Sequence, residues 1–540
     1  MNKNTFCIVA LLIAVNLQLN AQQEQKIRVE LEFVDNSYDG YQEFSKTASL
    51  YLEKVLNSDI FREYLSNLKM KKKRWKSNLE IYDLIMKGHE KQCLERISFE
   101  EAVNERCPKK NINKKYKCSI REKGIINLKV RTINECDGSD WLNKNCKLDS
   151  KMKTIGIDGN GDGVTAICPQ RLEKWLKDGR IDSLAGHYMH EYMHILGFSH
   201  KFPLWKYKSA VYKIGNLVTQ LVARELWIKD DLNLVNFNTD FSDYNQKTSV
   251  YCAQISKIVY WDSLGIANLH KQVSEKYPNA NYRYKFIDHK DKKSDTQALL
   301  WGNSDFLVIA FRGTEGRKLK DWITNIKFCN YKSNQDADEE IRNIPAGHGG
   351  FRRSLMNLIT KQNLFEKIDA FIKNGNPNAD VSKTPIYLTG HSLGAAISQL
   401  FIEPLELHTK SKYNFSGAYH FAPPLAVSCE VNEQMKNTYG DKVYDIVNYK
   451  DYVPRAGRNG VAHFGKFYRI CKDGLMYKEK ESYIKFKLFE YRRGHESHFL
   501  SNHLIALKDQ KNTIKGINDR SIIGEEYPCL KPKKEIRNCE

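Results

Sequence analysis

The chain has 540 residues, 41% of them hydrophobic, which is enough material for at least two ordinary cores. Its formal charge of +20 at pH 7 favours anionic partners such as acidic lipid headgroups on a membrane surface. No nucleic-acid-binding motif accompanies the basic residues, so specific nucleic-acid recognition is not expected. Composition leaves the oligomeric state open.

Residues 1–21 have the composition of a secretory signal peptide. Lys3 precedes the apolar stretch 6–17, and Ala21 ends the segment before a Gln-rich start. The apolar stretch is too short to anchor the chain across a bilayer. We therefore expect cleavage after Ala21 and a secreted or periplasmic protein.

The cysteines support the same expectation. The chain has 13, and removal of Cys7 with the signal leaves an even number, which in an exported protein predicts disulfides. An odd number falls between residues 93 and 252 and another odd number between 329 and 539. Either one bridge joins the two halves, or two thiols stay free.

The stretch before the first chemical motif has no clear function of its own. Residues 22–150 are charged and are expected to be helical and loop-rich, serving either as a pro-segment or as the upper part of the following domain. The runs 153–157 and 164–168 flank a Gly/Asp/Asn-rich segment and predict a β-hairpin. Pro169 stands where a calcium loop would have its final Glu, so an EF-hand is not expected.

A histidine-rich helical motif follows. His190 and His194 are four residues apart, so both can reach one zinc ion from the same helix face, with Glu191 beside them to activate a metal-bound water. Gly197 allows a sharp turn that brings His200 in as the third ligand and leaves a fourth position open.

This pattern resembles that of the metzincin zinc proteases. The resemblance implies an α+β metzincin-like zinc domain, whose core we place at 151–248, with a zinc cofactor and a peptide substrate. The family has a methionine turn beneath the metal, but no methionine occurs between Met193 and Met356. The segment 209–212 is expected in its place, with Val211 standing for the methionine. The domain is therefore either a working peptidase or an accessory domain that keeps only the metal.

The C-terminal half contains the pentapeptide Gly-His-Ser-Leu-Gly at 390–394, directly after the apolar run 386–388. An esterase nucleophile sits on a tight, strained turn between a strand and a helix, where side chains two residues away on either side would collide. Glycine at both flanking positions meets this need. Ser392 is therefore the predicted nucleophile.

An ordered series of motifs surrounds this serine, and with it the chain resembles the class 3 (fungal-type) lipases over about residues 251–507. The resemblance implies an α/β-hydrolase domain, which we place at 249–510, followed by a Cys-containing tail at 511–540. The apolar run at 306–311 predicts a buried strand. The motifs, in chain order, are Asp295–Ala298, Phe311–Thr314 at the end of that run, Asp321–Trp322, His348–Phe351, Gly390–Gly394, Asn448–Pro454, and His498 ahead of His503–Leu504.

Carried over to this chain, the resemblance implies a triad of Ser392, Asp451 and His498. The order Ser, Asp, His is also the one expected of this elbow. The backbone N–H of Leu393 and Thr314, through its N–H or hydroxyl, would hold the oxyanion. This half needs no cofactor. Asp451 precedes a Val-Pro pair, so the alternative is that it only caps a turn.

The general base is chosen from three clustered histidines. His495, His498 and His503 follow one another within a few residues. The family pattern has a histidine five residues before an aromatic-Leu pair, which selects His498 and puts His503 where tyrosine is usual.

A short amphipathic segment lies between the predicted strand at 306–311 and the serine elbow at 390–394. Its apolar residues recur at helical spacing and mark one face, formed by Leu319, Trp322, Ile323 and Ile326. In the lipases that the chain resembles, this segment is the lid over the acyl pocket. The alternative is a plain core helix.

Together these expectations describe an exported serine esterase or lipase that cleaves acylglycerol or phospholipid esters and carries an N-terminal zinc domain. One alternative is a secreted zinc endopeptidase whose lipase-like half only binds lipid. The other is a non-catalytic, basic surface-adhesion protein. Neither alternative needs an intact serine elbow.

Overall fold

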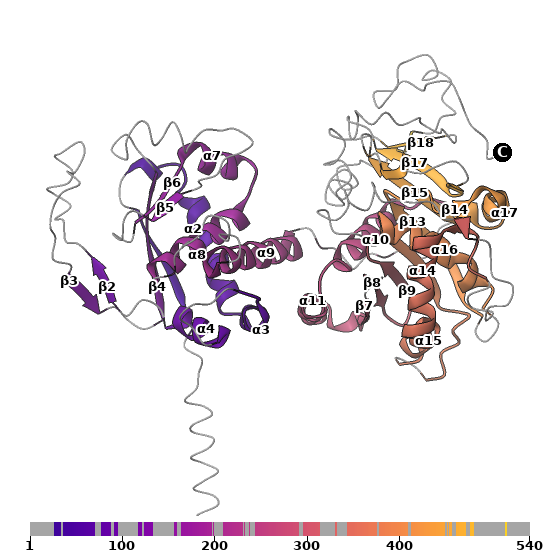
Figure 1. Cartoon of the computed structure of the whole chain (residues 1–540), viewed down its shortest axis with the longest axis horizontal. Helices are drawn as coiled ribbons and strands as arrows, with labels where there is room; N and C mark the ends of the chain where they lie inside the picture. Colours follow the sequence, from indigo (N-terminus) through magenta and orange to yellow (C-terminus); the bar gives the residue numbers. More distant parts are fainter. Residues whose placement is uncertain are drawn as a thin grey trace, which may run out of the picture. The chain divides into compact units, whose positions relative to one another are not determined.

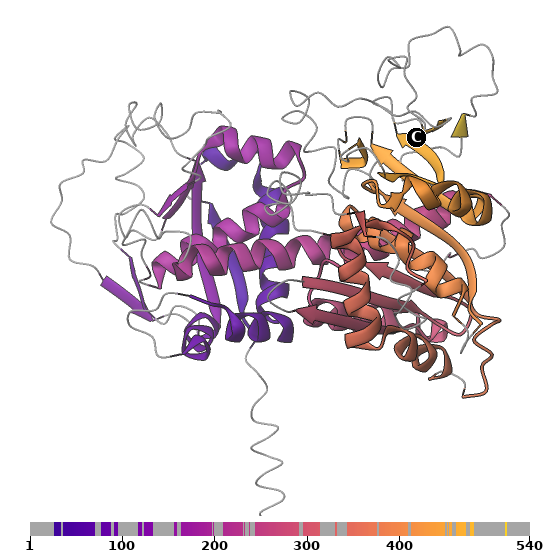
Figure 2. The same ribbon diagram turned by 45° about the vertical axis from the view of Figure 1, so that its right-hand side comes forward.

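The computed structural model (Figures 1 and 2) describes the chain in segments. They are 26–33, 36–70, 77–87, 91–94, 117–120, 124–132, 156–158, 164–196, 198, 209–230, 232, 237, 243–290, 295–313, 330–331, 343–374, 377–408, 412–448, 451, 453–455, 461–470, 476–479 and 514–515. The predicted signal peptide lies outside these segments, as does the predicted tail apart from 514–515.

The chain divides into two compact units, 1–232 and 233–540. The division lies before the boundary at 248/249 that was placed from the sequence. A helix that begins at Gln246 and belongs to the second unit spans that predicted boundary.

The first unit contains a mainly parallel sheet. Its strands follow the order β1 (Arg28–Phe33), β4 (Ile125–Thr132), β6 (Val164–Ile167) and β5 (Gly156–Asp158). Strands β5 and β6 pair antiparallel, as the hairpin prediction requires. Residues alternate between buried and partly exposed along β4, so one face of the sheet is covered. Because β1 and β4 come from the region 22–150, that region supplies strands to the same sheet as the predicted zinc domain.

Helices cover this sheet, and a small antiparallel pair, β2 (Lys91–Leu94) with β3 (Lys117–Ile120), adds to the unit. The helices are α2 (Gln42–Leu56), α3 (Asp59–Asn67), α4 (Asn78–Met86), α7 (Pro169–Lys177), α8 (Ile181–Ile195) and α9 (Ala210–Asp230). Helix α8 packs along α9 and α2 (Figure 1). The close crossing of α8 and α9 depends on Gly186, because a Cβ atom there would lie 1.8 Å from Thr219 Oγ1 and 2.8 Å from the Gly215 carbonyl oxygen.

The second unit contains a large, mostly parallel sheet. Its strands follow the order β19 (Ile514–Lys515), β18 (Met476–Glu479), β17 (Lys466–Ile470), β15 (Val443–Asn448), β13 (Asn414–Phe421), β12 (Pro385–His391), β9 (Leu307–Phe311), β8 (Asp295–Gly302) and β7 (Arg283–Lys290). The run from β17 to β9 is parallel throughout. Strand β9 agrees with the buried strand predicted at 306–311, and every residue in it is buried.

Helices lie on both faces of this sheet (Figure 1). On one face are α14 (Gly349–Met356), α15 (Leu364–Lys373) and α16 (Leu393–Glu406); on the other is α10 (Gln246–Ile258). The remaining helices are α11 (Ser263–Lys276) and α17 (Cys429–Tyr439), and a small antiparallel sheet joins β10 (Asn330–Tyr331), β11 (Gly347–His348), β14 (Val427–Ser428) and β16 (Val461–Ala462). A parallel sheet covered on both faces is the α/β architecture predicted for this half.

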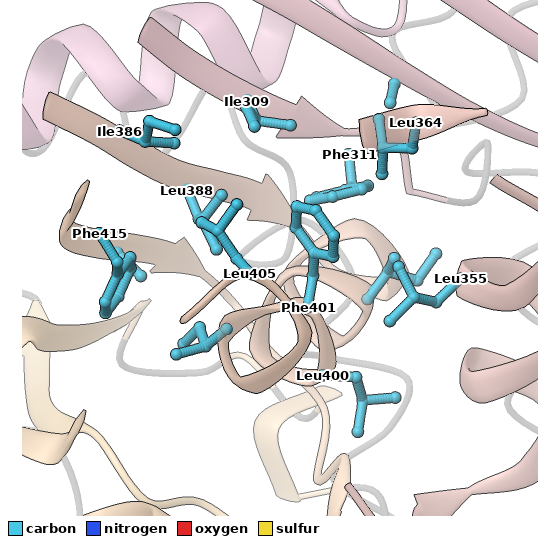
Figure 3. Close-up of a cluster of buried hydrophobic side chains, with 14 of the residues drawn as sticks. Ile309, Phe311, Leu355, Leu364, Ile386, Leu388, Leu400, Phe401, Leu405 and Phe415 are labelled. Carbon is cyan, nitrogen blue, oxygen red and sulfur yellow. The ribbon is translucent and has the colours of Figure 1, made fainter. Parts of the chain in front are cut away.

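The core beneath α16 is aromatic and aliphatic (Figure 3). Phe401 of α16 meets Phe311 of β9 edge to face, with 5.5 Å between the ring centroids, and lies 5.5 Å from Phe365 of α15. Leu388 of β12 is fully buried in the same cluster. Burial of each such side chain stabilises the fold by about 1.5–3 kcal/mol, so this cluster fixes the position of α16 on the sheet.

The three cysteines whose side chains the structure describes fall into two groups. Cys168 and Cys429 are disulfide-bonded. Cys252 is a buried free thiol, and burial raises its pKa, so it stays protonated. Among the described residues, no helix combines the length and apolar character needed to cross a membrane.

Candidate active site

Ser392 lies on the tight turn between β12 and α16. Its backbone has φ +57° and ψ −126°, a conformation that costs a residue with a side chain about 1–3 kcal/mol. Two hydrogen bonds hold it there: Ser392 N donates to the Phe421 carbonyl oxygen at 2.9 Å, and the Ser392 carbonyl oxygen accepts from Ala395 N at 3.0 Å. The strained elbow predicted from the pentapeptide is therefore present.

The two glycines of the motif are needed because the backbone passes too close for any side chain. A Cβ atom on Gly394 would lie 2.0 Å from the Phe311 carbonyl oxygen at the end of β9. A Cβ atom on Gly390 would lie 2.4 Å from the carbonyl carbon of Gly394. The elbow is thus pressed against the end of the neighbouring strand.

The hydroxyl of Ser392 is buried, and its Oγ has no hydrogen-bond partner among the described residues. Leu393 is the first residue of α16, so its N–H is one of those without an acceptor inside the helix, and it points from the positive end of the helix dipole. The predicted nucleophile and a predicted oxyanion donor are therefore adjacent in this turn.

Asp451 follows β15, which is separated from β12 by one strand, β13. All three strands are parallel, so their carboxyl ends meet at one edge of the sheet. The structure thus brings the predicted acid to the same edge as Ser392. Asp451 is buried, its N–H donates to Asn448 O at 2.9 Å, and its Oδ1 accepts from Val453 N at 2.9 Å. The carboxylate therefore also caps its own turn.

Several predicted site residues lie outside the described residues. They are the general base His498 with its neighbours His495 and His503, the oxyanion residue Thr314, the segment of Leu319, Trp322, Ile323 and Ile326, and the third metal ligand His200. The residue before Thr314 is described: a Cβ atom on Gly313 would lie 2.4 Å from the His391 carbonyl oxygen. The chain that leads to Thr314 therefore passes directly beside the elbow.

Sequence reasoning missed Tyr260. Its hydroxyl lies 3.0 Å from Nδ1 of His391, the residue before the nucleophile. The same hydroxyl would be 2.2 Å from a Cβ atom on Gly313, so it fills the space between the elbow and the end of β9. No short motif links positions so far apart in the chain, so local sequence patterns could not predict the contact of Tyr260 with His391.

Sequence reasoning also missed a buried polar cluster under the acid. Asp445 of β15 accepts from His420 Nδ1 at 3.0 Å and from Gln399 Nε2 at 3.1 Å, and its Oδ2 lies 3.4 Å from His463 Nδ1. His420 Nε2 lies 2.9 Å from Ser398 Oγ. Burial by itself would raise the pKa of Asp445, but contacts with the two histidines outweigh it and hold that pKa below its usual value.

In the first unit, α8 places His190, Glu191 and His194 as the helical spacing predicts. The rings of the two histidines lie 5.2 Å apart, centroid to centroid, and Glu191 is buried. His194 Nδ1 lies 2.7 Å from the Phe198 carbonyl oxygen. A carbonyl can only accept, so Nδ1 carries the proton and the lone pair of the neutral ring is on Nε2. This tautomer is the one that a zinc-binding histidine needs.

A second histidine layer supports Glu191. His187 lies one turn earlier on α8, with Nδ1 3.5 Å from Glu191 Oε1. Burial, followed by the nearby His194 and Arg171, lowers the pKa of His187 to about 3, so its ring is neutral.

The segment expected to replace the methionine turn is instead the start of a helix. Val211 and Tyr212 belong to the first turn of α9, because apolar residues continue at helical spacing through Ile214 and Val218. Tyr212 nevertheless packs edge to face on His190, with 4.6 Å between the ring centroids. A wall of the histidine site therefore comes from α9, although not as a turn.

The metal ligands are only partly within the described residues. Among these residues no group of three His, Cys, Asp or Glu side chains is arranged to hold a metal ion. His190 and His194 lie side by side on one face of α8, and the Nδ1 contact of His194 leaves its Nε2 available to a zinc ion. The described part of the site is therefore compatible with the predicted metal without completing it.

A serine on a strained strand-to-helix turn, with an acid at the same edge of a parallel sheet, defines the α/β-hydrolase class of site. Residues 308–459 match the family model of lipase (class 3). The matched segment includes Ser392 and Asp451, so the resemblance of the C-terminal half to class 3 lipases is confirmed over these residues.

The similarity to individual proteins is lower. Triacylglycerol lipase OBL1 of Arabidopsis thaliana is 24% identical over 263 residues, which cover 41% of this chain and 48% of that protein. The chain thus spans about half the length of this curated relative. Among solved structures, a lipase from Rhizopus microsporus var. chinensis is 19% identical with a TM-score of 0.32, covering 42% of this chain and 74% of that one. Yarrowia lipolytica LIP2 lipase is 18% identical with a TM-score of 0.34, covering 45% and 89%.

The contact between Gly394 and Phe311 predicts a sharp effect of one methyl group. Changing Gly394 to Ala should displace the elbow, because the atom that the new Cβ meets is backbone, and should destabilise the fold by about 1–3 kcal/mol. Labelling of Ser392 by a fluorophosphonate should fall with it. Thermal unfolding and the labelling rate measure the two effects.

The control is Gly417→Ala in β13, where the nearest atom to a new Cβ is 3.3 Å away. It should unfold closer to the wild-type temperature and keep its labelling rate. Wild-type labelling in Gly394→Ala would show that the elbow tolerates a side chain at this position.

Proposed function

We propose that the second unit is a serine hydrolase that cleaves carboxylic esters of lipids, either acylglycerols or phospholipids. The observation that carries the proposal is the backbone of Ser392, held at φ +57° with its buried hydroxyl at the start of α16. Strain of this kind persists only where the surrounding structure enforces it, and it is typical of functional sites. The family match over 308–459 supports the ester-hydrolase chemistry.

In the proposed mechanism His498 accepts the proton of Ser392 while the serine oxygen attacks the ester carbonyl. Asp451 orients His498 and stabilises the imidazolium, and water later hydrolyses the acyl-enzyme. The N–H of Leu393 and Thr314 hold the developing oxyanion, where each donor lowers the barrier by about 3 kcal/mol. The burial of Asp451 and its fixed turn support this role, because an orienting acid must not rotate.

The substrate is proposed to reach this site from a lipid surface. The segment 319–326, with its apolar face, would act as a lid that opens onto lipid. The formal charge of +20 would draw the protein to an anionic membrane. The protein is also proposed to be exported through the signal peptide at 1–21. The disulfide-bonded state of Cys168 and Cys429 suits an oxidising compartment.

We also propose that the first unit holds a zinc ion through His190 and His194 of α8 together with His200. Glu191 would act as general base toward a peptide substrate. The specific observation is the contact of His194 Nδ1 with the Phe198 carbonyl oxygen, which fixes the tautomer. Zinc bound there would supply a Lewis acid and an activated water. His187 would keep Glu191 oriented, since both side chains are buried and 3.5 Å apart.

Two other functions remain as competitors. One is a secreted zinc endopeptidase whose second unit only binds lipid, and the other is a non-catalytic, basic surface-adhesion protein. Neither alternative function requires a strained serine with flanking glycines. A Ser392 that does not react with esters would favour both alternatives over the esterase proposal.

Replacing Ser392 with Ala should abolish ester hydrolysis and leave the fold intact, because a triad knockout costs several orders of magnitude in turnover. The measurement is hydrolysis of short- and long-chain p-nitrophenyl esters, with circular dichroism to confirm folding. Ser416→Ala, a part-buried serine on β13, serves as control and should keep its activity. A Ser392→Ala protein with wild-type turnover would remove the nucleophile assignment.

The clustered histidines can be separated by a panel of single variants. His498→Ala should lose turnover as completely as Ser392→Ala, because the base is as necessary as the nucleophile. His495→Ala and His503→Ala should retain most of it. Steady-state kinetics on a soluble ester give the answer, and dependence on either neighbour would transfer the role of base to it.

The purified protein should contain about one zinc per chain, and the two sites should act independently. His194→Ala should lose the metal, whereas Glu191→Gln should retain it and lose any peptidase activity. Elemental analysis and a casein assay report these outcomes. Chelation should spare ester hydrolysis, since the serine site needs no metal. Wild-type protein without metal after zinc reconstitution would contradict the zinc proposal, and chelator-sensitive esterase in the folded protein would contradict independence.

A further inference from the structure

We propose that His463 is a positioning residue: its ring links the buried carboxylate of Asp445 to the turn that carries Asp451. The inference concerns how the acid of the site is held in place. Its structural part stands on the contacts alone, and its kinetic consequence rests on the proposed esterase function.

The two ring nitrogens of His463 face two groups that can only accept. Nε2 lies 3.0 Å from the Pro454 carbonyl oxygen. Nδ1 lies 3.4 Å from Asp445 Oδ2. At Nε2 the ring can donate to the carbonyl oxygen, whereas the Nδ1 contact is within ion-pair distance but lacks hydrogen-bond geometry. The ring therefore lies between the two groups and contacts both.

The charge on Asp445 requires such a partner. Its side chain is fully buried in β15, and an uncompensated carboxylate there would cost several kcal/mol. Gln399 donates to both carboxylate oxygens at 3.1 Å but carries no charge. His420 donates from Nδ1 and can accept the Ser398 hydroxyl at Nε2, so it is satisfied as a neutral ring. Within the described residues, His463 is thus the remaining partner at ion-pair distance from Asp445.

The other end of the link fixes the acid. Pro454 lies three residues after Asp451, and between them Val453 N donates to Asp451 Oδ1 at 2.9 Å. The Pro454 carbonyl oxygen belongs to the peptide that follows Pro454, in the same short 3-10 turn as Val453. Holding this oxygen anchors the turn whose Val453 N–H orients the carboxylate. His463 is itself held, because Asn432 Nδ2 donates to its carbonyl oxygen at 3.0 Å.

The first test uses hydrogen–deuterium exchange and needs no substrate. His463→Phe keeps a planar ring beside Phe467, 5.5 Å away in the wild type, but removes both donors. Exchange of the backbone amides within 451–455 should rise about tenfold, since the turn loses the hydrogen bond that His463 Nε2 makes to the Pro454 carbonyl oxygen. His463→Gln should restore part of the protection, because its amide group has two N–H donors.

The matched control is Gln399→Leu, which removes a different donor to Asp445 and leaves the link to Pro454 in place. It should lower the melting temperature without selectively raising exchange at 451–455. Unchanged exchange of the turn in His463→Phe would overturn the proposal, as would an equal rise in Gln399→Leu. If His463→Phe fails to fold, His463→Gln with exchange equal to the wild type elsewhere and raised only in the turn would support it; wild-type exchange throughout would overturn it.

The second test is a double-mutant cycle on ester hydrolysis. His463→Phe should lower kcat about tenfold with little change in KM, since the acid and not substrate binding is disturbed. In an Asp451→Asn background the same change should cost nothing further, because the residue it positions is already absent. Additive losses would show that His463 does not act through Asp451. A wild-type protein without esterase activity would remove the proposed function, while the exchange experiment would still decide the link.

Discussion

The second unit depends on one close contact, that of the Gly394 backbone with the carbonyl oxygen of Phe311. The end of β9 and the start of α16 meet here with no room for a Cβ atom. The aromatic cluster around Phe401 lies between α16 and the sheet and packs the helix against β9. The strained φ of Ser392 is therefore maintained by the packing of α16 on the sheet, which also places the Ser392 hydroxyl.

The buried polar cluster around Asp445 of β15 has a different role from this packing contact. Asp445 is an ionised group inside the sheet, and replacing such a group with apolar packing is often neutral or stabilising. Stability alone is therefore a weak reason for its presence. The carboxylate gives a fixed point inside β15, and His463 transfers that position to the turn of Asp451. Ser392 is thus held by steric packing, whereas Asp451 is held by hydrogen bonds.

The sequence predicted those features that local patterns specify. The strand at 306–311, the hairpin before residue 168, the helix of His190 and His194, and the elbow all follow from spacing over a few residues. Tyr260 and His463 could not be found in this way, because their partners are far away in the chain and no repeat or motif connects them. The strands contributed by 22–150 were missed for the same reason, since the pairing of β1 with β4 and of β4 with β6 is a property of the sheet. Val211 was expected in a turn, but the apolar residues that follow it continue the helical spacing of α9.

His194 and His463 each place one ring nitrogen against a carbonyl oxygen. They differ in what the second ring nitrogen faces. His194 gives its Nδ1 proton to a carbonyl oxygen, so its Nε2 carries a lone pair, and the ring suits a metal cation. His463 also faces a carbonyl oxygen through Nε2, but its Nδ1 lies beside a carboxylate, so its ring lies between two acceptors. The same residue type is thus proposed as a metal ligand in one unit and as a positioning link in the other. What separates them is the second partner, which the fold supplies and which no spacing of histidines in the sequence reveals.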